Sequence, residues 1–136
     1  MSEQTLFQRI IADEIPGVVV HEDEHCVVLM DAFPSVPGQT MVIPREPIAY
    51  FVDAEDPLLA HLMQVAKKIA QASDQAFKTS RTCLVIEGFE VPHLHLKLFP
   101  VSQASGVTAL TDVITNTDEA TLEERQQWAN LIKAAL

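Results

Sequence analysis

The sequence contains little that is typical of a secreted or membrane-embedded protein. It has only two cysteines, Cys26 and Cys83, and no CxxC pair, so we expect free, buried thiols in a reducing compartment. Long apolar runs are missing as well: Cys26–Met30 has five residues, whereas a membrane-spanning helix needs about 20. The polar start, Met1–Thr5, lacks the basic and apolar segments of a signal peptide, which predicts a cytoplasmic protein with no membrane partner.

Positive charge is also scarce, with 9 Lys and Arg against 19 Asp and Glu and a net charge of −10. A field of this sign repels polyanions, so we expect no nucleic acid polymer as a partner. The net negative charge does not exclude a small phosphorylated ligand that binds in a locally basic pocket. Hydrophobic residues make up 48% of the 136 positions, and no repeat or linker interrupts the chain, so we expect one compact domain.

The pattern of apolar residues predicts an α+β domain with a mainly antiparallel sheet. A short helix over residues 5–11 comes first. Runs rich in β-branched residues then predict a hairpin of residues 18–22 and 26–30 and further strands over residues 40–44, 82–86 and 93–101. We assign no structure to residues 102–117.

Two further helices are expected. The long one begins near Pro57, and its apolar positions recur at helical spacing. Thr121 and Glu124 have the spacing of a capping box and open the last helix. The candidate buried residues are Leu58, Leu62, Val65, Ile69 and Ala72 in the long helix and Leu122, Trp128, Leu131 and Ile132 in the last one.

The stretch from Val91 to Pro100 carries the most chemical information. In a strand, successive side chains alternate faces, so His93, His95 and Lys97 share one face, about 6.6–6.8 Å apart. Leu94, Leu96 and Leu98 share the other face and are expected to pack on the core. An imidazole near neutral pH is a nucleophile or proton carrier, and a nearby cation stabilises phosphate oxygens, so the row suits phosphoryl or nucleotidyl transfer.

Alternation alone leaves two other interpretations open. The row also suits an ordinary amphipathic surface strand with incidental histidines. Two histidines at this spacing can bind zinc, but a closed zinc site needs two further ligands. The remaining histidines, His21, His25 and His61, have no spacing that indicates a position near this strand.

Two separate blocks of the sequence, in the right order, resemble the histidine triad (HIT) superfamily of nucleotide hydrolases and transferases. The matching segments are 7–16, 22–24, 29–31, Pro34, 37–38, 42–44 and 91–96. The resemblance implies a HIT-like fold, a five-stranded antiparallel sheet with one long helix and short flanking helices. It also implies a HIT core over residues 1–101 and a C-terminal extension over residues 102–136, with a helix, in the same domain.

The resemblance implies a role for each residue of the motif. His95 corresponds to the nucleophile that attacks the α-phosphorus and forms a nucleotidyl-histidine, which water or another acceptor then discharges. His93 positions the His95 ring and holds its tautomer. Lys97 stands where hydrolase branches have a third histidine and transferase branches have glutamine. Lysine keeps a charge for phosphate oxygens but is a poor proton shuttle.

A nucleoside pocket is implied between the first helix and the second strand. Asp31 matches the acidic residue that takes the ribose hydroxyls, and Phe7, Ile10, Leu29 and Ala32 match the apolar walls around the base. Without the resemblance, Asp31 is interpreted as a turn residue and the four apolar side chains as ordinary core.

The zinc-bearing branches of the family have an N-terminal CxxC, where this chain has Thr5 and Gln8. We therefore expect no metal and no cofactor. Glu87 and Glu90 near the phosphate site repel a substrate unless they point away or pair with Arg45 or Lys97.

The resemblance thus implies an enzyme that acts at the α-phosphate of an adenosine (purine) nucleotide, such as a dinucleoside polyphosphate or a nucleoside phosphoramidate. It also implies a homodimer. Because Lys97 replaces the third histidine, a catalytically impaired protein that only binds nucleotides is the second possible function. A protein-interaction or metal-binding domain is the third.

Overall fold

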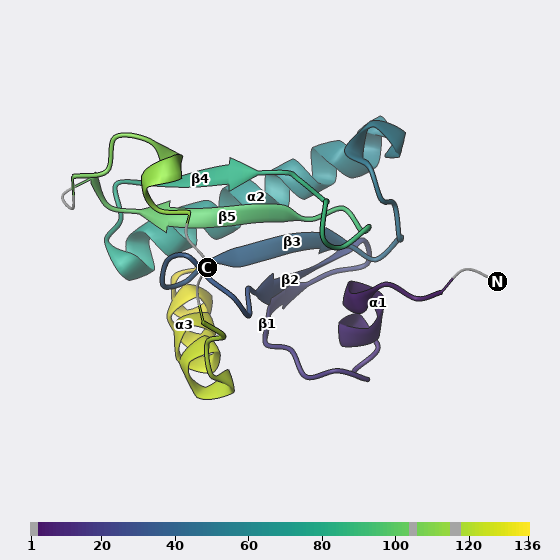
Figure 1. Ribbon diagram of the computed structural model, residues 1–136, viewed down its shortest axis with the longest axis horizontal. Helices are drawn as coiled ribbons and strands as arrows, with labels where there is room; N and C mark the ends of the chain where they lie inside the picture. Colours follow the sequence, from purple (N-terminus) through teal and green to yellow (C-terminus); the bar gives the residue numbers. More distant parts are fainter. Residues whose placement is uncertain (1–2, 104–105, 115–117) are drawn as a thin grey trace.

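The computed structural model describes residues 3–103, 106–114 and 118–136, which contain a five-stranded sheet (Figure 1). The strand order is β1–β2–β3–β5–β4, and each neighbouring pair is antiparallel, which confirms the expected α+β class. The strands are β1 (Val19–Glu22), β2 (Cys26–Met30), β3 (Thr40–Pro44), β4 (Arg81–Val85) and β5 (Leu96–Val101). The helices are α1 (Leu6–Ile11), α2 (Asp56–Phe77), α3 (Leu122–Ala135) and the short 3-10 helices η1 (Phe51–Asp53) and η3 (Leu110–Asp112).

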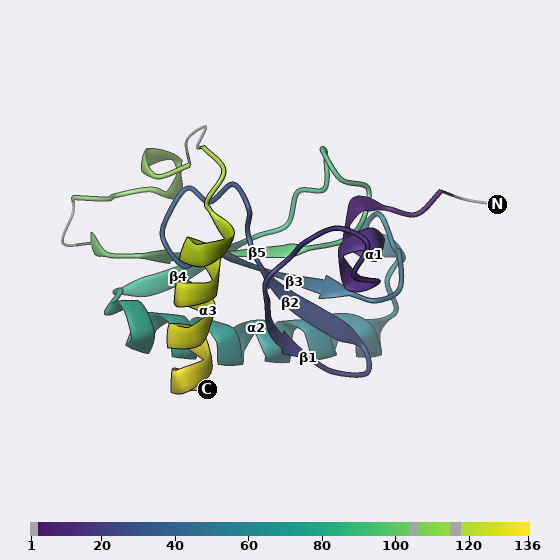
Figure 2. The same cartoon turned by 90° about the horizontal axis from the view of Figure 1, so that it is seen from below.

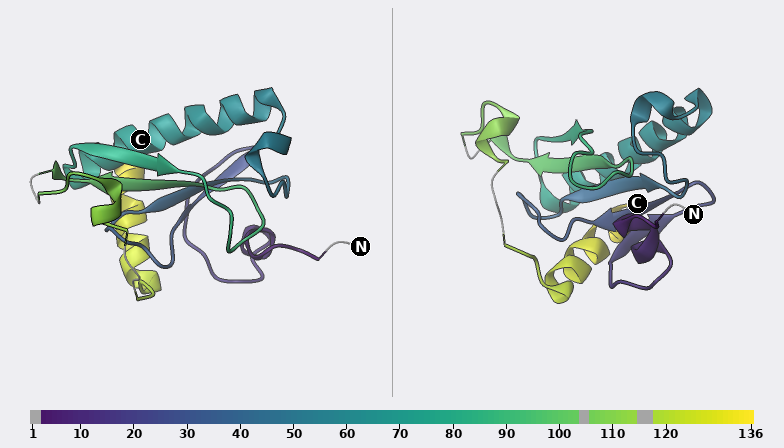
Figure 3. Two further views of the ribbon diagram at one scale, coloured as in Figure 1. Left: turned by 45° about the horizontal axis from the view of Figure 1, so that its top comes forward. Right: turned by 45° about the vertical axis from the view of Figure 1, so that its right-hand side comes forward.

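The sheet is covered on both faces. α2 runs along one face, and the short α1 lies on the other (Figures 2 and 3). Side chains of β2 alternate between the two sides: Val28 and Met30 join the core under α2, whereas Val27 and Leu29 pack with Phe7 of α1. Both faces of β2 and β3 are therefore buried, which explains the apolar runs Cys26–Met30 and Met41–Pro44.

The long helix α2 has the apolar stripe that its sequence predicts. Leu62, Val65 and Ile69 are buried against the sheet, and Pro57 lies in the first turn, where it costs no hydrogen bond. At the other end, the ring of Phe77 packs so closely on Gly38 (φ +80°) that a Cβ there would overlap it. No helix in the described part of the chain is long and apolar enough to cross a membrane.

The fifth strand begins later than predicted, at Leu96 rather than His93. The ladder with β3 ends at the pair Val42–Leu96, and the N–H of Leu94 donates instead to the Ile48 carbonyl, in the loop after β3 (2.6 Å). The Pro44 carbonyl at the end of β3 accepts a hydrogen bond from His93 Nε2 (2.7 Å). The expected alternation still holds, because Leu94, Leu96 and Leu98 belong to the core under α2.

The last helix, α3, begins with the predicted capping box but buries a different face. Ile132 is fully buried and Trp128 is partly buried, as expected. Leu122 and Leu131 are half exposed, so their predicted burial is wrong. The helix runs at a steep angle to α2 (Figures 1 and 2), and the small Ala129 and the side chain of Arg125 take the inward positions beside Ile132.

Candidate functional site

A cavity of about 870 Å³ opens on the sheet face that carries α1. Side chains of β2, β3 and β5 line its inner side, and the loop after β4 and the segment around the start of α3 line its rim. Of the residues predicted for the site, all but His93 line it: Phe7, Ile10, Leu29, Asp31, Ala32, His95 and Lys97. The fold therefore gathers residues that are up to 90 positions apart in the sequence, from Phe7 to Lys97.

The two histidines form a chain of hydrogen bonds that assigns their tautomers. His93 Nε2 lies 2.7 Å from the Pro44 carbonyl, so this nitrogen carries the proton, and Nδ1 accepts from the Thr5 hydroxyl (2.6 Å). His95 Nδ1 lies 2.7 Å from the His93 carbonyl, so it is the donor. The Nε2 of His95 keeps its lone pair, and no hydrogen-bond partner for it lies among the described residues.

Both imidazoles are held neutral by their surroundings. Burial lowers the pKa of His93, and the hydrogen bond to Pro44 opposes this only in part. Burial also lowers the pKa of His95; Lys97 adds to this effect, while the His93 carbonyl, Asp31 and Glu87 oppose it. A neutral ring with a free Nε2 is the nucleophilic form of histidine.

The ring of His95 is also fixed by packing. Phe7 meets it edge to face with a centroid separation of 4.9 Å, and meets His93 at 5.6 Å. Phe7 is itself buried, so the hydrogen bond on Nδ1 and the phenyl ring together hold the orientation of the imidazole. The apolar wall from α1 thus reaches the histidines directly.

The cation of Lys97 and two carboxylates line the same cavity. Lys97 is half buried and follows His95 on the same side of the chain. Glu87 and Glu90 also line the cavity, and no ion pair involves either of them in the ranges that the structure covers. Arg45 binds Glu22 (3.4 Å) instead. The charges of Glu87 and Glu90 therefore lower the affinity for an anionic ligand.

Asp31 follows β2 and is 8% exposed. Its Oδ1 accepts from the Phe33 N–H (3.0 Å), and its Oδ2 accepts from Gln39 Nε2 (2.7 Å). Gln39 in turn accepts from the Ser35 N–H through Oε1 (2.7 Å). These bonds fix the carboxylate at the cavity wall and leave acceptor capacity for a ligand hydroxyl.

Sequence reasoning missed several residues of the site. Thr5 stands where the zinc-bearing branches have a cysteine, yet its hydroxyl both caps α1 and binds His93. The capping-box spacing of Thr5 and Gln8 was a visible signal for the first of these roles. Gln39 had no such signal. The C-terminal segment also lines the cavity, through Ile114, Glu119, Leu122 and Arg125.

Arg125 is the most deeply buried cation of this segment. Its Nε donates to the Ala120 carbonyl (3.2 Å), and its guanidinium lies 3.7 Å from Glu119. The Ala120 N–H donates to the Ala32 carbonyl (2.8 Å), which ties the start of α3 to the loop after β2.

Comparison with known proteins agrees with the motif. The family model described as HIT domain matches residues 12–104, more than half of the chain. The chain belongs to the HIT family. HIT proteins form a superfamily of nucleotide-binding hydrolases and transferases. An uncharacterized HIT-like protein of Synechococcus elongatus is 37% identical over 103 residues, which cover 72% of this chain and 90% of that relative.

Solved HIT structures share the fold over nearly the whole chain. A Hit-like protein of Bartonella henselae, described as involved in cell-cycle regulation and solved with an unknown ligand, has a TM-score of 0.86 at 28% identity and covers 99% of this chain and 98% of that one. A hypothetical histidine triad nucleotide-binding protein of Sulfolobus tokodaii has a TM-score of 0.81 at 25% identity, with 95% and 89% covered. The HIT-like fold expected from the resemblance is confirmed.

Proposed function

We propose that this HIT protein hydrolyses or transfers the nucleotidyl group of an adenosine nucleotide through a covalent intermediate on His95. The observation that carries the proposal is the free Nε2 of a neutral, oriented imidazole in a cavity large enough for a nucleotide. Suitable substrates are dinucleoside polyphosphates and nucleoside phosphoramidates.

The reaction has two displacements at the α-phosphorus. The lone pair of His95 Nε2 forms the N–P bond, and the bond from phosphorus to the leaving oxygen or nitrogen breaks with its electron pair. Water or another acceptor then attacks the same phosphorus and releases a proton to solvent, and the N–P bond breaks with its electron pair returning to Nε2. His93 supports both steps as a positioning residue, because its carbonyl keeps the proton of His95 on Nδ1.

Lys97 stabilises the negative charge on the phosphate oxygens during both displacements. A lysine ammonium is a poor proton donor compared with imidazolium, so we expect faster turnover of dinucleoside polyphosphates, whose phosphate leaving group needs no protonation, than of phosphoramidates, whose amine leaving group does. Asp31 accepts hydrogen bonds from the ribose hydroxyls, and the base lies against Phe7, Ile10, Leu29 and Ala32.

The test is release of AMP from a panel of dinucleoside polyphosphates and phosphoramidates. We expect native protein to turn over at least one of them and His95→Ala to lose that activity. His25→Ala is the matched control, because that side chain is 56% exposed and lies outside the cavity. Equal turnover by the native protein and His95→Ala would contradict the proposal.

A protein that binds nucleotides without turning them over is the second candidate. Lys97 in the third position and the unpaired Glu87 and Glu90 favour it. It predicts AMP binding by calorimetry but no covalent nucleotide on His95 after rapid acid quenching; a trapped adduct rules it out. Lys97→His further distinguishes the enzyme from the binding protein. We expect this variant to hydrolyse the substrate faster than the native protein; a lower activity would mean that the site is adapted to lysine.

We also propose that the protein is a homodimer. β4 is an outer strand of the sheet, and its side chains are mostly half buried, so it offers a pairing edge to a second copy. Light scattering after size exclusion decides this, since a mass of 15.0 kDa contradicts it. Cytoplasmic residence stays a prediction.

A further inference from the structure

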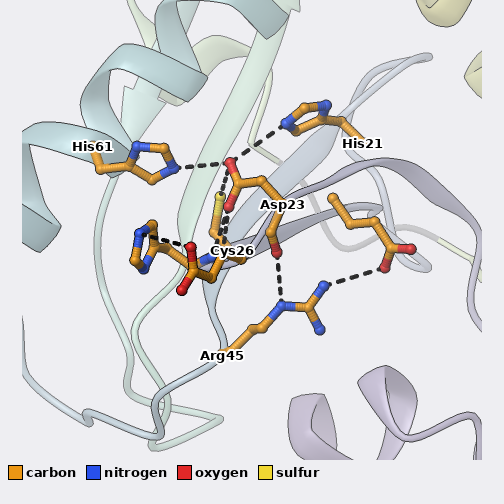
Figure 4. A network of polar contacts seen from close by, with 8 residues as sticks. His21, Asp23, Cys26, Arg45 and His61 are labelled. Carbon is orange, nitrogen blue, oxygen red and sulfur yellow. Dashed lines mark hydrogen bonds and ion pairs between the residues drawn. The ribbon is translucent and has the colours of Figure 1, made fainter.

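A group of potential metal ligands lies at the turn between β1 and β2, on the side where α2 begins its course (Figure 4). Ligand atoms of Asp23, Cys26 and His61 all lie within 4.8 Å of one another. His21 of β1 adds a fourth group, with its Nε2 3.6 Å from Asp23 Oδ2. We call these four residues the turn cluster: His21, Asp23, Cys26 and His61.

The carboxylate of Asp23 is the centre of the turn cluster. Its Oδ1 accepts from the backbone N–H groups of His25 (2.8 Å) and Cys26 (2.9 Å), so the carboxylate cannot rotate freely. Its Oδ2 is then directed at the other three side chains (Figure 4). Burial alone raises the pKa of Asp23, but the bonds from these amides and from the His61 ring outweigh it and hold the pKa well below its usual value.

The distances from Asp23 Oδ2 to the other three ligand atoms are close to those of a tetrahedral zinc site. With zinc–ligand bonds of about 2.0–2.3 Å, neighbouring ligand atoms lie about 3.3–3.8 Å apart. Asp23 Oδ2 lies 3.6 Å from Cys26 Sγ and 3.6 Å from His21 Nε2. Of these three distances, only the one to His61 Nε2, at 2.8 Å, has to widen, by about 0.5 Å. The His21 ring also has to turn toward Cys26 and His61, because it is not one of the three residues whose ligand atoms all lie within 4.8 Å of one another.

We propose that the turn cluster binds a zinc ion, which joins the β1–β2 turn to α2. One thiolate, two imidazoles and one carboxylate are a donor set that suits Zn²⁺. Binding releases the thiol proton of Cys26 to solvent. It also moves the proton of His61 from Nε2, where the hydrogen bond to Asp23 now places it, to Nδ1.

The chemistry of Cys26 shows what the ion supplies. The thiol of Cys26 is fully buried and donates to Asp23 Oδ2 over 3.6 Å, so it carries its proton in the metal-free protein. A bound Zn²⁺ deprotonates a coordinating thiol outright. The buried thiol and the ionised carboxylate thus become favourable neighbours once the ion is present.

The turn cluster is separate from the nucleotide cavity. Cys26 belongs to the core under α2, whereas Phe7, Leu29 and Met41, which line the cavity beside His95, belong to the core on the α1 side of the sheet. A second cavity of about 570 Å³ is lined by His21, Asp23 and His61 and by α2, which gives an ion a path from solvent. The N-terminal position of the family's CxxC is not involved, since Thr5 there binds His93.

Cobalt(II) provides the test, because a tetrahedral cobalt–thiolate site has a charge-transfer band that reports the sulfur ligand. Protein stripped of metal with a chelator is titrated with CoCl₂ and then with ZnCl₂. We expect one cobalt per chain with this band, and its displacement by zinc. Cys26→Ser abolishes the band, whereas Cys83→Ser, the matched control at the other free cysteine, keeps it.

Other variants keep the test decisive. His61 is partly exposed on α2, so His61→Ala folds, and we expect its cobalt affinity to fall at least tenfold. His95→Ala binds cobalt as the native protein does. A missing band in native protein, a band that persists in Cys26→Ser, unchanged affinity in His61→Ala, or loss of binding in His95→Ala would each overturn the proposal.

Discussion

Replacing Gln39 by glutamate tests the polar wall of the cavity that contains His95, because the two side chains have almost the same shape. Gln39 is 2% exposed, and its Nε2 donates to Asp31 Oδ2 over 2.7 Å. In Gln39→Glu the donor becomes an oxygen that carries negative charge. A buried hydrogen bond is thereby converted into a contact between two carboxylates.

The distance sets the size of the effect. Two unit charges 2.7 Å apart repel by about 6 kcal/mol at an effective dielectric constant of about 20, and by about 1.5 kcal/mol in bulk water. Loss of a hydrogen bond to a charged acceptor adds about 1.5–3 kcal/mol. We therefore expect the free energy of unfolding at pH 8 to fall by at least about 3 kcal/mol, a large share of the roughly 5–15 kcal/mol of a typical domain.

Urea unfolding at pH 8 and pH 5 measures the loss and its cause. A proton shared between the two carboxyls restores a hydrogen bond, so the deficit of Gln39→Glu shrinks at pH 5. Gln127→Glu adds the same charge at an exposed position of α3 and serves as the control. If the two variants unfold at the same urea concentration at pH 8, the contact between Gln39 and Asp31 does not exist as described.

Acidification should lower the stability of the native protein. Because the folded-state pKa of His93 and of His95 lies below the unfolded value of about 6.5, the unfolded chain binds more protons as pH falls through that value, and the urea midpoint drops between pH 7.5 and pH 5. A flat midpoint contradicts the buried neutral rings. Gly38→Ala should cost about 2–5 kcal/mol, from a positive φ and overlap with the ring at the end of α2, and an unchanged thermal midpoint refutes this. Ile132→Ala should cost about 2–5 kcal/mol in urea, whereas Leu131→Ala, on the exposed face of the same helix, changes the free energy of unfolding by no more than about 0.5 kcal/mol. If both variants lose the same free energy of unfolding, the described packing of α3 is wrong.

Local patterns in the sequence predict the elements well, because each depends on neighbours within a few residues. The stripe of α2 repeats at helical spacing, and the capping box at Thr121 marks the start of α3 by itself. The alternation from Leu94 to Leu98 also survives, since it needs only an extended chain.

Local sequence patterns do not predict contacts between segments that are distant in the sequence. The start of β5 depends on the loop after β3, where the Ile48 carbonyl accepts the hydrogen bond from the N–H of Leu94. The buried face of α3 depends on the surface that it meets, so Leu131 points outward although leucine is more apolar than the inward Arg125. Thr5 and His93 are 88 positions apart, and nothing in either local sequence connects them.

Because α3 lies beside the cavity, the proposed nucleophile and part of the cavity wall come from different parts of the sequence. The segment before β5 carries the proposed nucleophile His95, whereas Glu119, Leu122 and Arg125 line the same cavity from a later part of the sequence. Mutations in the final segment can therefore change which ligand is selected without disturbing the nucleophile.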